Sequence, residues 1–94
     1  MSLMEFTKEM PSEFAVMEKF AITQVQARIL LRLWQSGDDG TDDLYHYRSV
    51  RQHIYNMRKR LKPFGITILN LADRRYGMPL NSRTIMARLF NWTS

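Results

Sequence analysis

Cysteine is absent from all 94 residues of this chain. Disulfides, thiolate nucleophiles and thiolate-ligated zinc or iron–sulfur sites are therefore excluded, and the composition is typical of a reducing, cytoplasmic compartment. No apolar run approaches the roughly 18 residues that a membrane-spanning helix needs, and no basic segment followed by an apolar stretch indicates a secretory signal. We therefore expect a cytoplasmic protein without a membrane partner, with one globular domain over residues 22–94 and an extension over residues 1–21.

Acidic residues are nearly absent from the second half of the chain. Residues 44–94 contain ten lysines and arginines but a single carboxylate, Asp73, whereas residues 1–43 contain four basic and eight acidic side chains. The net charge of +5 is therefore the sum of a negative first half and a strongly positive second half. Such a positive segment is typical of a polyanion-binding surface, because a lysine or arginine placed at a phosphate releases condensed counterions. A basic surface without a partner is the alternative.

Patterns for metal binding and catalysis are also lacking. The acidic residues between 38 and 43 do not have the spacing of a calcium loop, and the two histidines, His46 and His53, fall on different predicted helices. No glycine-rich phosphate loop and no nucleophile–base arrangement is present. We therefore expect no enzyme activity, no cofactor, no metal and no small-molecule substrate.

The first half of the chain predicts two helices. Ser12 can cap a short helix with Phe14, Met17 and Phe20 on one side, although a strand over residues 14–17 is the alternative. Thr23 and Gln26 form a capping-box pattern that starts an amphipathic helix over residues 23–36. Gly37 is placed to end that helix.

The middle of the chain predicts a turn and two further helices. Residues 38–40 read as the turn, and Thr41 can cap a short helix that runs to about residue 47. Ser49 is placed to cap a helix over residues 50–62, which Pro63 helps to end. One stripe of that helix is apolar, with the spacing of a buried face; it consists of Val50, Ile54, Met57 and Leu61.

The last third of the chain changes from helical to alternating periodicity. Residues 66–80 predict a β-hairpin with a polar tip at residues 73–75, and Pro79 indicates an edge strand. Ser82 is placed to cap a final helix over residues 82–91, and Trp92 is expected to pack against the core beyond it. Four apolar residues are expected on the inner side of that helix: Ile85, Met86, Leu89 and Phe90.

The opposite side of the helix over residues 50–62 is polar and suited to reading DNA. In the major groove arginine pairs with guanine edges, and asparagine or glutamine pairs with adenine edges. Arginines at a hairpin tip can reach phosphates or a minor groove. The absence of an aromatic stacking platform favours duplexes over single strands, and a merely solvated polar face is the alternative. The candidate DNA-binding residues are Arg48, Arg51, Gln52, Tyr55, Asn56, Arg58, Lys59, Arg60, Lys62, Arg74 and Arg75.

Residues 50–61, VRQHIYNMRKRL, resemble the recognition helix of the OmpR/PhoB-type winged-helix effector domains of bacterial response regulators. Those helices have a pattern like V-x-x-H-I-x-x-L-R-x-K-L, and residues 66–80 resemble the wing that follows, with Tyr76 near its tyrosine. The resemblance covers roughly residues 22–80 and includes neither a receiver domain nor a glycine-rich wing tip. It implies an α+β winged helix–turn–helix with a three-helix core and a β-hairpin wing, to which the predicted C-terminal helix over residues 82–91 is an extra feature. The matching residues are Val50, His53, Ile54, Met57, Arg58 and Leu61.

The resemblance also implies roles for the candidate residues. Arg48 and Arg58 would touch phosphates, Arg74 and Arg75 would serve the wing, and His53 would lie at a partly buried helix edge. We therefore expect a double-stranded DNA-binding transcriptional regulator, monomeric or a weak homodimer. The alternatives are a winged-helix protein-interaction module or a non-catalytic subunit of a DNA-processing machine. The residues that would face the major groove are Arg51, Gln52, Tyr55, Asn56 and Lys59.

Overall fold

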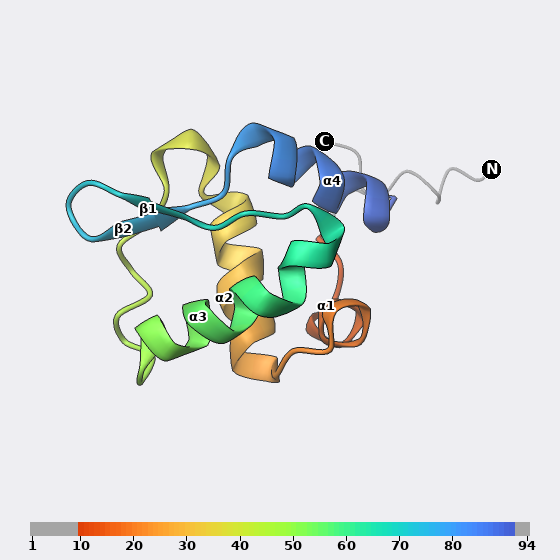
Figure 1. Cartoon of the computed structure of the whole chain (residues 1–94), viewed down its shortest axis with the longest axis horizontal. Coiled ribbons are helices and arrows are strands. Elements are labelled where there is room, and N and C mark those ends of the chain that lie inside the picture. The colour runs from red at the N-terminus through yellow and green to blue at the C-terminus, as the bar shows by residue number, and fades with distance from the viewer. Residues whose placement is uncertain (1–9, 92–94) are drawn as a thin grey trace.

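The structure, a computed structural model, describes residues 10–91, which form an α+β fold (Figure 1). Helix α2 runs through the middle of the molecule, and α3 crosses it; the hairpin and α1 lie on opposite sides. Within residues 10–91, no helix has the length and apolar character required to cross a membrane. The elements are α1 (Glu13–Phe20), α2 (Gln24–Gln35), α3 (Val50–Leu61), β1 (Leu69–Leu71), β2 (Arg75–Gly77) and α4 (Leu80–Leu89).

Helix α1 confirms the predicted short helix and its cap. The Ser12 hydroxyl accepts a hydrogen bond from the Ala15 amide at 3.1 Å. Val16 and Phe20, one turn apart, are buried in the core, so α1 packs against α2 as part of the same core. The prediction that Phe14 shares the inner side was wrong, because its side chain is 74% exposed. Phe14 lies two residues from Val16, which places it on nearly the opposite side of the helix.

Helix α2 forms as its sequence pattern predicts. The Thr23 hydroxyl accepts from the Gln26 amide, and the Gln26 side-chain oxygen accepts from the Thr23 amide, each at 3.2 Å. This reciprocal capping box satisfies two amides that a helix start otherwise leaves unpaired. Gly37, at φ +68°, follows the end of the helix as predicted. The buried face of α2 forms the centre of the core and includes Ala27, Ile29, Leu30, Leu33 and Trp34.

The predicted short helix over residues 41–47 does not form. Thr41 instead pairs with Tyr76 of β2 through two backbone hydrogen bonds, of 2.8 and 2.9 Å, and the chain then continues in turns. Its hydroxyl donates to the Asp43 carboxylate at 2.6 Å rather than capping a helix. That bond, together with Arg32, lowers the pKa of Asp43 below its usual value. The expected three-helix core, which began with the helix over residues 23–36, therefore lacks its middle helix, and α1 packs against α2 from outside the predicted core.

Helix α3 has the predicted apolar stripe and the predicted first residue, but it lacks the predicted cap. All four stripe residues are buried, and the helix ends at Leu61, one residue before the predicted end. The prediction of a Ser49 side-chain cap was wrong, because Ser49 has the left-handed conformation (φ +55°) and makes no cap hydrogen bond. An N-cap residue normally has extended dihedrals that aim its side chain at the first turn, and Ser49 does not.

The hairpin is shorter than the predicted range of 66–80. Only Leu69–Leu71 and Arg75–Gly77 pair, with Asn70 opposite Tyr76. Ile66 and Ile68 are buried as the alternation predicted, but they lie outside the paired strands. Asp73 and Arg74, at φ +59° and +62°, form a two-residue tip. The Arg75 amide donates a hydrogen bond to the Ala72 carbonyl and closes the turn. Two consecutive positive φ values are typical of the tight turn that suits the twist of a hairpin.

Helix α4 begins two residues earlier than predicted. Pro79 precedes it with φ −67°, so Pro79 is the N-cap of α4 rather than part of an edge strand. The predicted Ser82 cap was wrong: Ser82 is fully buried, and its hydroxyl accepts from the Thr67 amide at 2.9 Å. This bond fixes the segment between α3 and β1 against α4. Trp92 lies outside the described residues.

Candidate nucleic-acid interface

Helix α3, its flanking residues and the hairpin tip carry cations that form no ion pair within residues 10–91. Within residues 10–91 the ion pairs are Arg28–Glu13 at 2.9 Å, Arg32–Asp43 at 3.0 Å and Arg83–Asp38. None of the three pairs includes a residue of α3 or of the hairpin. In the same part of the chain, eight predicted DNA-binding cations have no carboxylate partner: Arg48, Arg51, Arg58, Lys59, Arg60, Lys62, Arg74 and Arg75.

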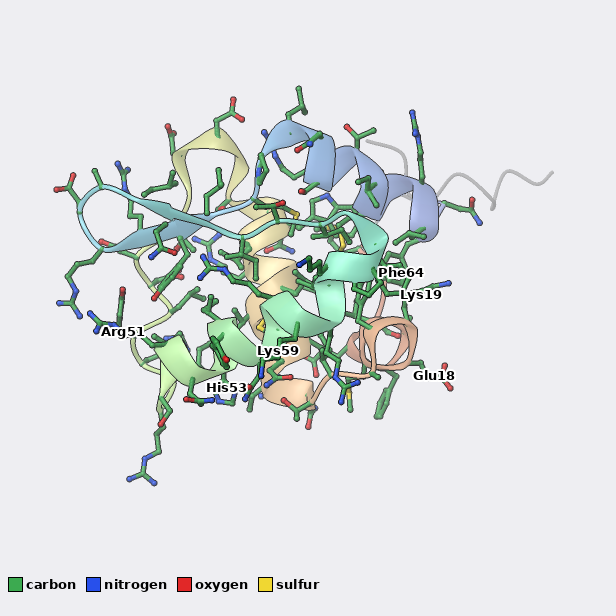
Figure 2. The ribbon with its side chains drawn as sticks, viewed as in Figure 1. Glu18, Lys19, Arg51, His53, Lys59 and Phe64 are labelled. Carbon is green, nitrogen blue, oxygen red and sulfur yellow. The ribbon has the colours of Figure 1, made fainter. Side chains whose placement is uncertain are left out.

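The predicted polar face of α3 is solvent-exposed along its length. It consists of Arg51, Gln52, Tyr55, Asn56 and Lys59. The Gln52 amide donates to the Asn56 side-chain oxygen at 3.4 Å, and the Lys59 ammonium lies 4.4 Å from the centre of the Tyr55 ring. Figure 2 shows Arg51 near the start of α3 and Lys59 further along the helix. The face therefore offers amide and cationic groups in a row along one helix.

Arg58 connects α3 to the strand of the hairpin. Its Nε and Nη2 donate to the Ile68 carbonyl at 3.2 and 2.7 Å, and Nη2 also donates to the Asn70 side-chain oxygen at 2.6 Å. The guanidinium predicted to touch a phosphate is thus largely engaged within the protein, with Nη1 left available. Arg58 acts first as the group that fixes β1 relative to α3.

The two arginines of the hairpin tip are held in different ways. The Arg74 guanidinium lies 4.3 Å from the centre of the Tyr45 ring, while Arg75 Nε donates to the Ala72 carbonyl at 3.2 Å. Both contacts leave other N–H groups available, since a guanidinium has five donors. Arg48, Arg60 and Lys62 are exposed around α3, so the structure brings all the predicted cations to α3, its flanks and the hairpin.

A cavity of about 440 Å³ lies between α3 and the hairpin. Besides arginines, its walls include Tyr45, Tyr55 and Tyr76. The Tyr45 and Tyr76 ring centres are 6.2 Å apart. Burial, followed by the neighbouring Tyr45, raises the pKa of Tyr76 above its ordinary value, while Arg51 and Arg58 act in the opposite direction. Sequence reasoning missed this aromatic wall, because the three tyrosines lie on separate segments with no shared periodicity.

His53 lies at the partly buried edge of α3, as predicted (Figure 2). Its Nδ1 lies 3.3 Å from the side-chain nitrogen of Gln26 on α2. Because the Gln26 oxygen already accepts from the Thr23 amide, its nitrogen donates to an unprotonated His53 Nδ1. The other histidine, His46, contacts the Asp43 carbonyl at 2.7 Å. Among residues 10–91, no group of three or more histidine, aspartate or glutamate side chains is placed to hold a metal ion.

No known protein family, curated protein or solved structure matches this chain. What the surface can do therefore follows from its own groups. Exposed guanidinium, ammonium and amide groups donate hydrogen bonds to phosphates and to base edges, and none of these cations is ion-paired to a carboxylate within the described residues. These groups are suited to a polyanion that presents both phosphates and base edges.

Proposed function

We propose that this protein binds double-stranded DNA as a winged helix–turn–helix and regulates transcription. In this proposal α3 lies in the major groove and the β1–β2 hairpin is the wing. The observation that supports it most strongly is the segregation of charge: within residues 10–91, three of the five cations on α1, α2 and α4 pair with a carboxylate, whereas none of the eight cations around α3 and the hairpin does. Unneutralised cations in a row are what a phosphate backbone attracts.

The order of the elements also supports this proposal. Helix α2 is followed by turns, by α3 and then by a hairpin, and in helix–turn–helix proteins the later helix enters the major groove. Arg58 holds the hairpin beside α3, and the Thr41–Tyr76 pairing attaches the hairpin to the loop that follows α2. A wing fixed in this way contacts the backbone next to the groove that the helix occupies.

The size of the polar face suits a short stretch of base pairs. Residues 51–59 extend for about 12 Å along α3, at the usual helical rise of about 1.5 Å per residue. That length corresponds to roughly three to four base pairs of duplex. Within it, Gln52 and Asn56 are the groups suited to adenine edges, whereas Arg51 and Lys59 suit guanine edges or phosphates.

The test compares a variant of α3 with a variant of the hairpin tip. Each is bound to a random-sequence duplex and to a duplex whose sequence has been selected for tight binding to the unmodified protein. Asn56→Ala is expected to reduce the preference for the selected sequence by about 1–3 kcal/mol, roughly 5- to 150-fold, because a base contact is lost. Arg74→Gly is expected to weaken binding to all sequences alike and to lower the salt slope by about one. Glycine is suitable there because it adopts the positive φ of Arg74 without strain.

Arg88→Gln is the matched control, since Arg88 is an exposed arginine on α4, outside the proposed interface. Its affinity for either duplex should stay close to that of the unmodified protein. Equal effects of Asn56→Ala and Arg74→Gly on sequence preference would show that the division between base and phosphate contacts is wrong. If Arg88→Gln lost as much affinity for DNA as Arg74→Gly, the interface would lie elsewhere.

A further inference from the structure

The cavity between α3 and the hairpin has features that duplex binding does not use. Its volume, about 440 Å³, falls in the range of roughly 300–1,000 Å³ typical of small-molecule sites. Among residues 10–91 no acidic side chain lines it, and its four arginines come from two elements and the turn between two strands. They are Arg51, Arg58, Arg74 and Arg75.

These arginines are arranged in advance of any ligand. Arg58 and Arg75 are held by backbone carbonyls, and Arg74 lies on the Tyr45 ring, so little side-chain freedom remains to be lost on binding. Arg51 has no carboxylate partner within the described residues and retains its donors. Guanidinium groups bind phosphate oxygens through paired, charge-assisted hydrogen bonds. One wall of the cavity is therefore suited to a phosphate group.

The other wall is aromatic, and the paired bases of a duplex do not stack on its ring faces. The Tyr55 side chain is 56% exposed, and Tyr45 and Tyr76 complete the lining. In a duplex the bases are stacked inside the helix, away from such rings. An unpaired base, by contrast, can stack on an exposed aromatic ring at the same time as its phosphate contacts arginine.

We propose that this cavity binds a nucleoside phosphate, with the phosphate on Arg51 and the hairpin arginines and the base against Tyr55. The nucleoside phosphate is either a free nucleotide or an unpaired nucleotide of a nucleic-acid strand. This site uses some of the cations of the proposed DNA interface, but it does not require duplex binding.

The test titrates the full chain with adenosine 5′-monophosphate, adenosine and inorganic phosphate separately, by isothermal calorimetry. The nucleotide should bind about tenfold or more tightly than either part, because it alone engages both walls. Inorganic phosphate binding as tightly as the nucleotide would overturn the proposal, since the rings would then contribute nothing. Absence of nucleotide binding would overturn it as well.

Variants locate the site. Arg51→Gln should weaken nucleotide binding about tenfold and Tyr55→Leu about fivefold, whereas Tyr55→Phe, which keeps the ring, should stay within about twofold. Both positions are exposed, so the fold is retained. Arg88→Gln on α4 is the matched control and should bind as the unmodified protein does. If Arg51→Gln and Arg88→Gln bind the nucleotide equally, the cavity is not the site.

Two duplexes distinguish the sources of the nucleotide. One duplex has a single unpaired terminal nucleotide and the other is blunt. If the first binds more tightly, and free nucleotide abolishes this difference in affinity, the ligand is an unpaired nucleotide of a strand. Equal binding of the two, with nucleotide binding retained, supports a free nucleotide. The blunt duplex also separates the proposals: if it binds and the nucleotide does not, only the cavity proposal fails. If only the nucleotide binds, only the duplex proposal fails.

Discussion

Gly40→Ala is expected to lower the free energy of unfolding by about 3–5 kcal/mol, because it combines backbone strain with a clash. Gly40 has φ +70° and ψ −167°, a region that side chains other than glycine essentially never adopt. An added Cβ would lie 2.5 Å from the Tyr76 carbonyl oxygen, which is backbone and cannot move aside cheaply. The pairing of Thr41 with Tyr76 would be displaced, and the hairpin would lose its attachment to the preceding loop.

Gly37→Ala separates the two causes. Gly37 also has a positive φ, +68°, but an added Cβ meets nothing within 4 Å. It should therefore cost only the strain of the left-handed conformation, about 1–2 kcal/mol. Urea unfolding of both variants, followed by circular dichroism, gives the comparison. Equal losses in the two variants would show that the close approach of Gly40 to β2 contributes nothing to stability.

Arg58→Ala is expected to lower the free energy of unfolding by about 2 kcal/mol and to change the position of the hairpin relative to α3. The substitution removes the charge-assisted hydrogen bonds to the Ile68 carbonyl and the Asn70 side chain. Ile68 itself is buried, so solvent does not easily replace the lost donor. Unfolding measurements and amide NMR shifts of residues 69–77 report the two effects.

Arg60→Ala is the matched control for Arg58→Ala. Arg60 lies on the same helix and is exposed, without a hydrogen-bonded or carboxylate partner among residues 10–91. Its stability should remain within about 0.5 kcal/mol of the unmodified protein. If the control and Arg58→Ala are equally stable and the hairpin amides do not shift, Arg58 does not position the hairpin.

The helices were predictable because their signals are local. The capping box of Thr23 and Gln26 sets the start of α2, and the spacing from Val50 to Leu61 identifies the buried stripe of α3. These signals depend on residues three or four positions apart, and the helix realises them directly. The exposed polar face of α3 follows from the same periodicity, so this part of the candidate site was also predictable.

The features that sequence reasoning missed depend on contacts between distant segments. Thr41 has the pattern of a helix cap, but its backbone pairs with Tyr76, and no periodicity indicates that pairing. Ser82 also has the pattern of a cap, yet the Thr67 amide uses its hydroxyl. The aromatic wall of the cavity arises in the same way, since its tyrosines meet only after the hairpin has folded onto α3. Tertiary contacts override local propensity at these positions.

The most direct test of the central claim is the binding of the unmodified protein to random-sequence duplex DNA, measured by fluorescence anisotropy at two salt concentrations. If about five of the eight unneutralised cations lie on phosphates, affinity should fall roughly 500-fold between about 50 and about 200 mM salt. Such a fall is the result that the account predicts. No binding at the lower concentration, or an affinity that does not change with salt, would contradict the assignment of α3 and the hairpin as a DNA-binding surface.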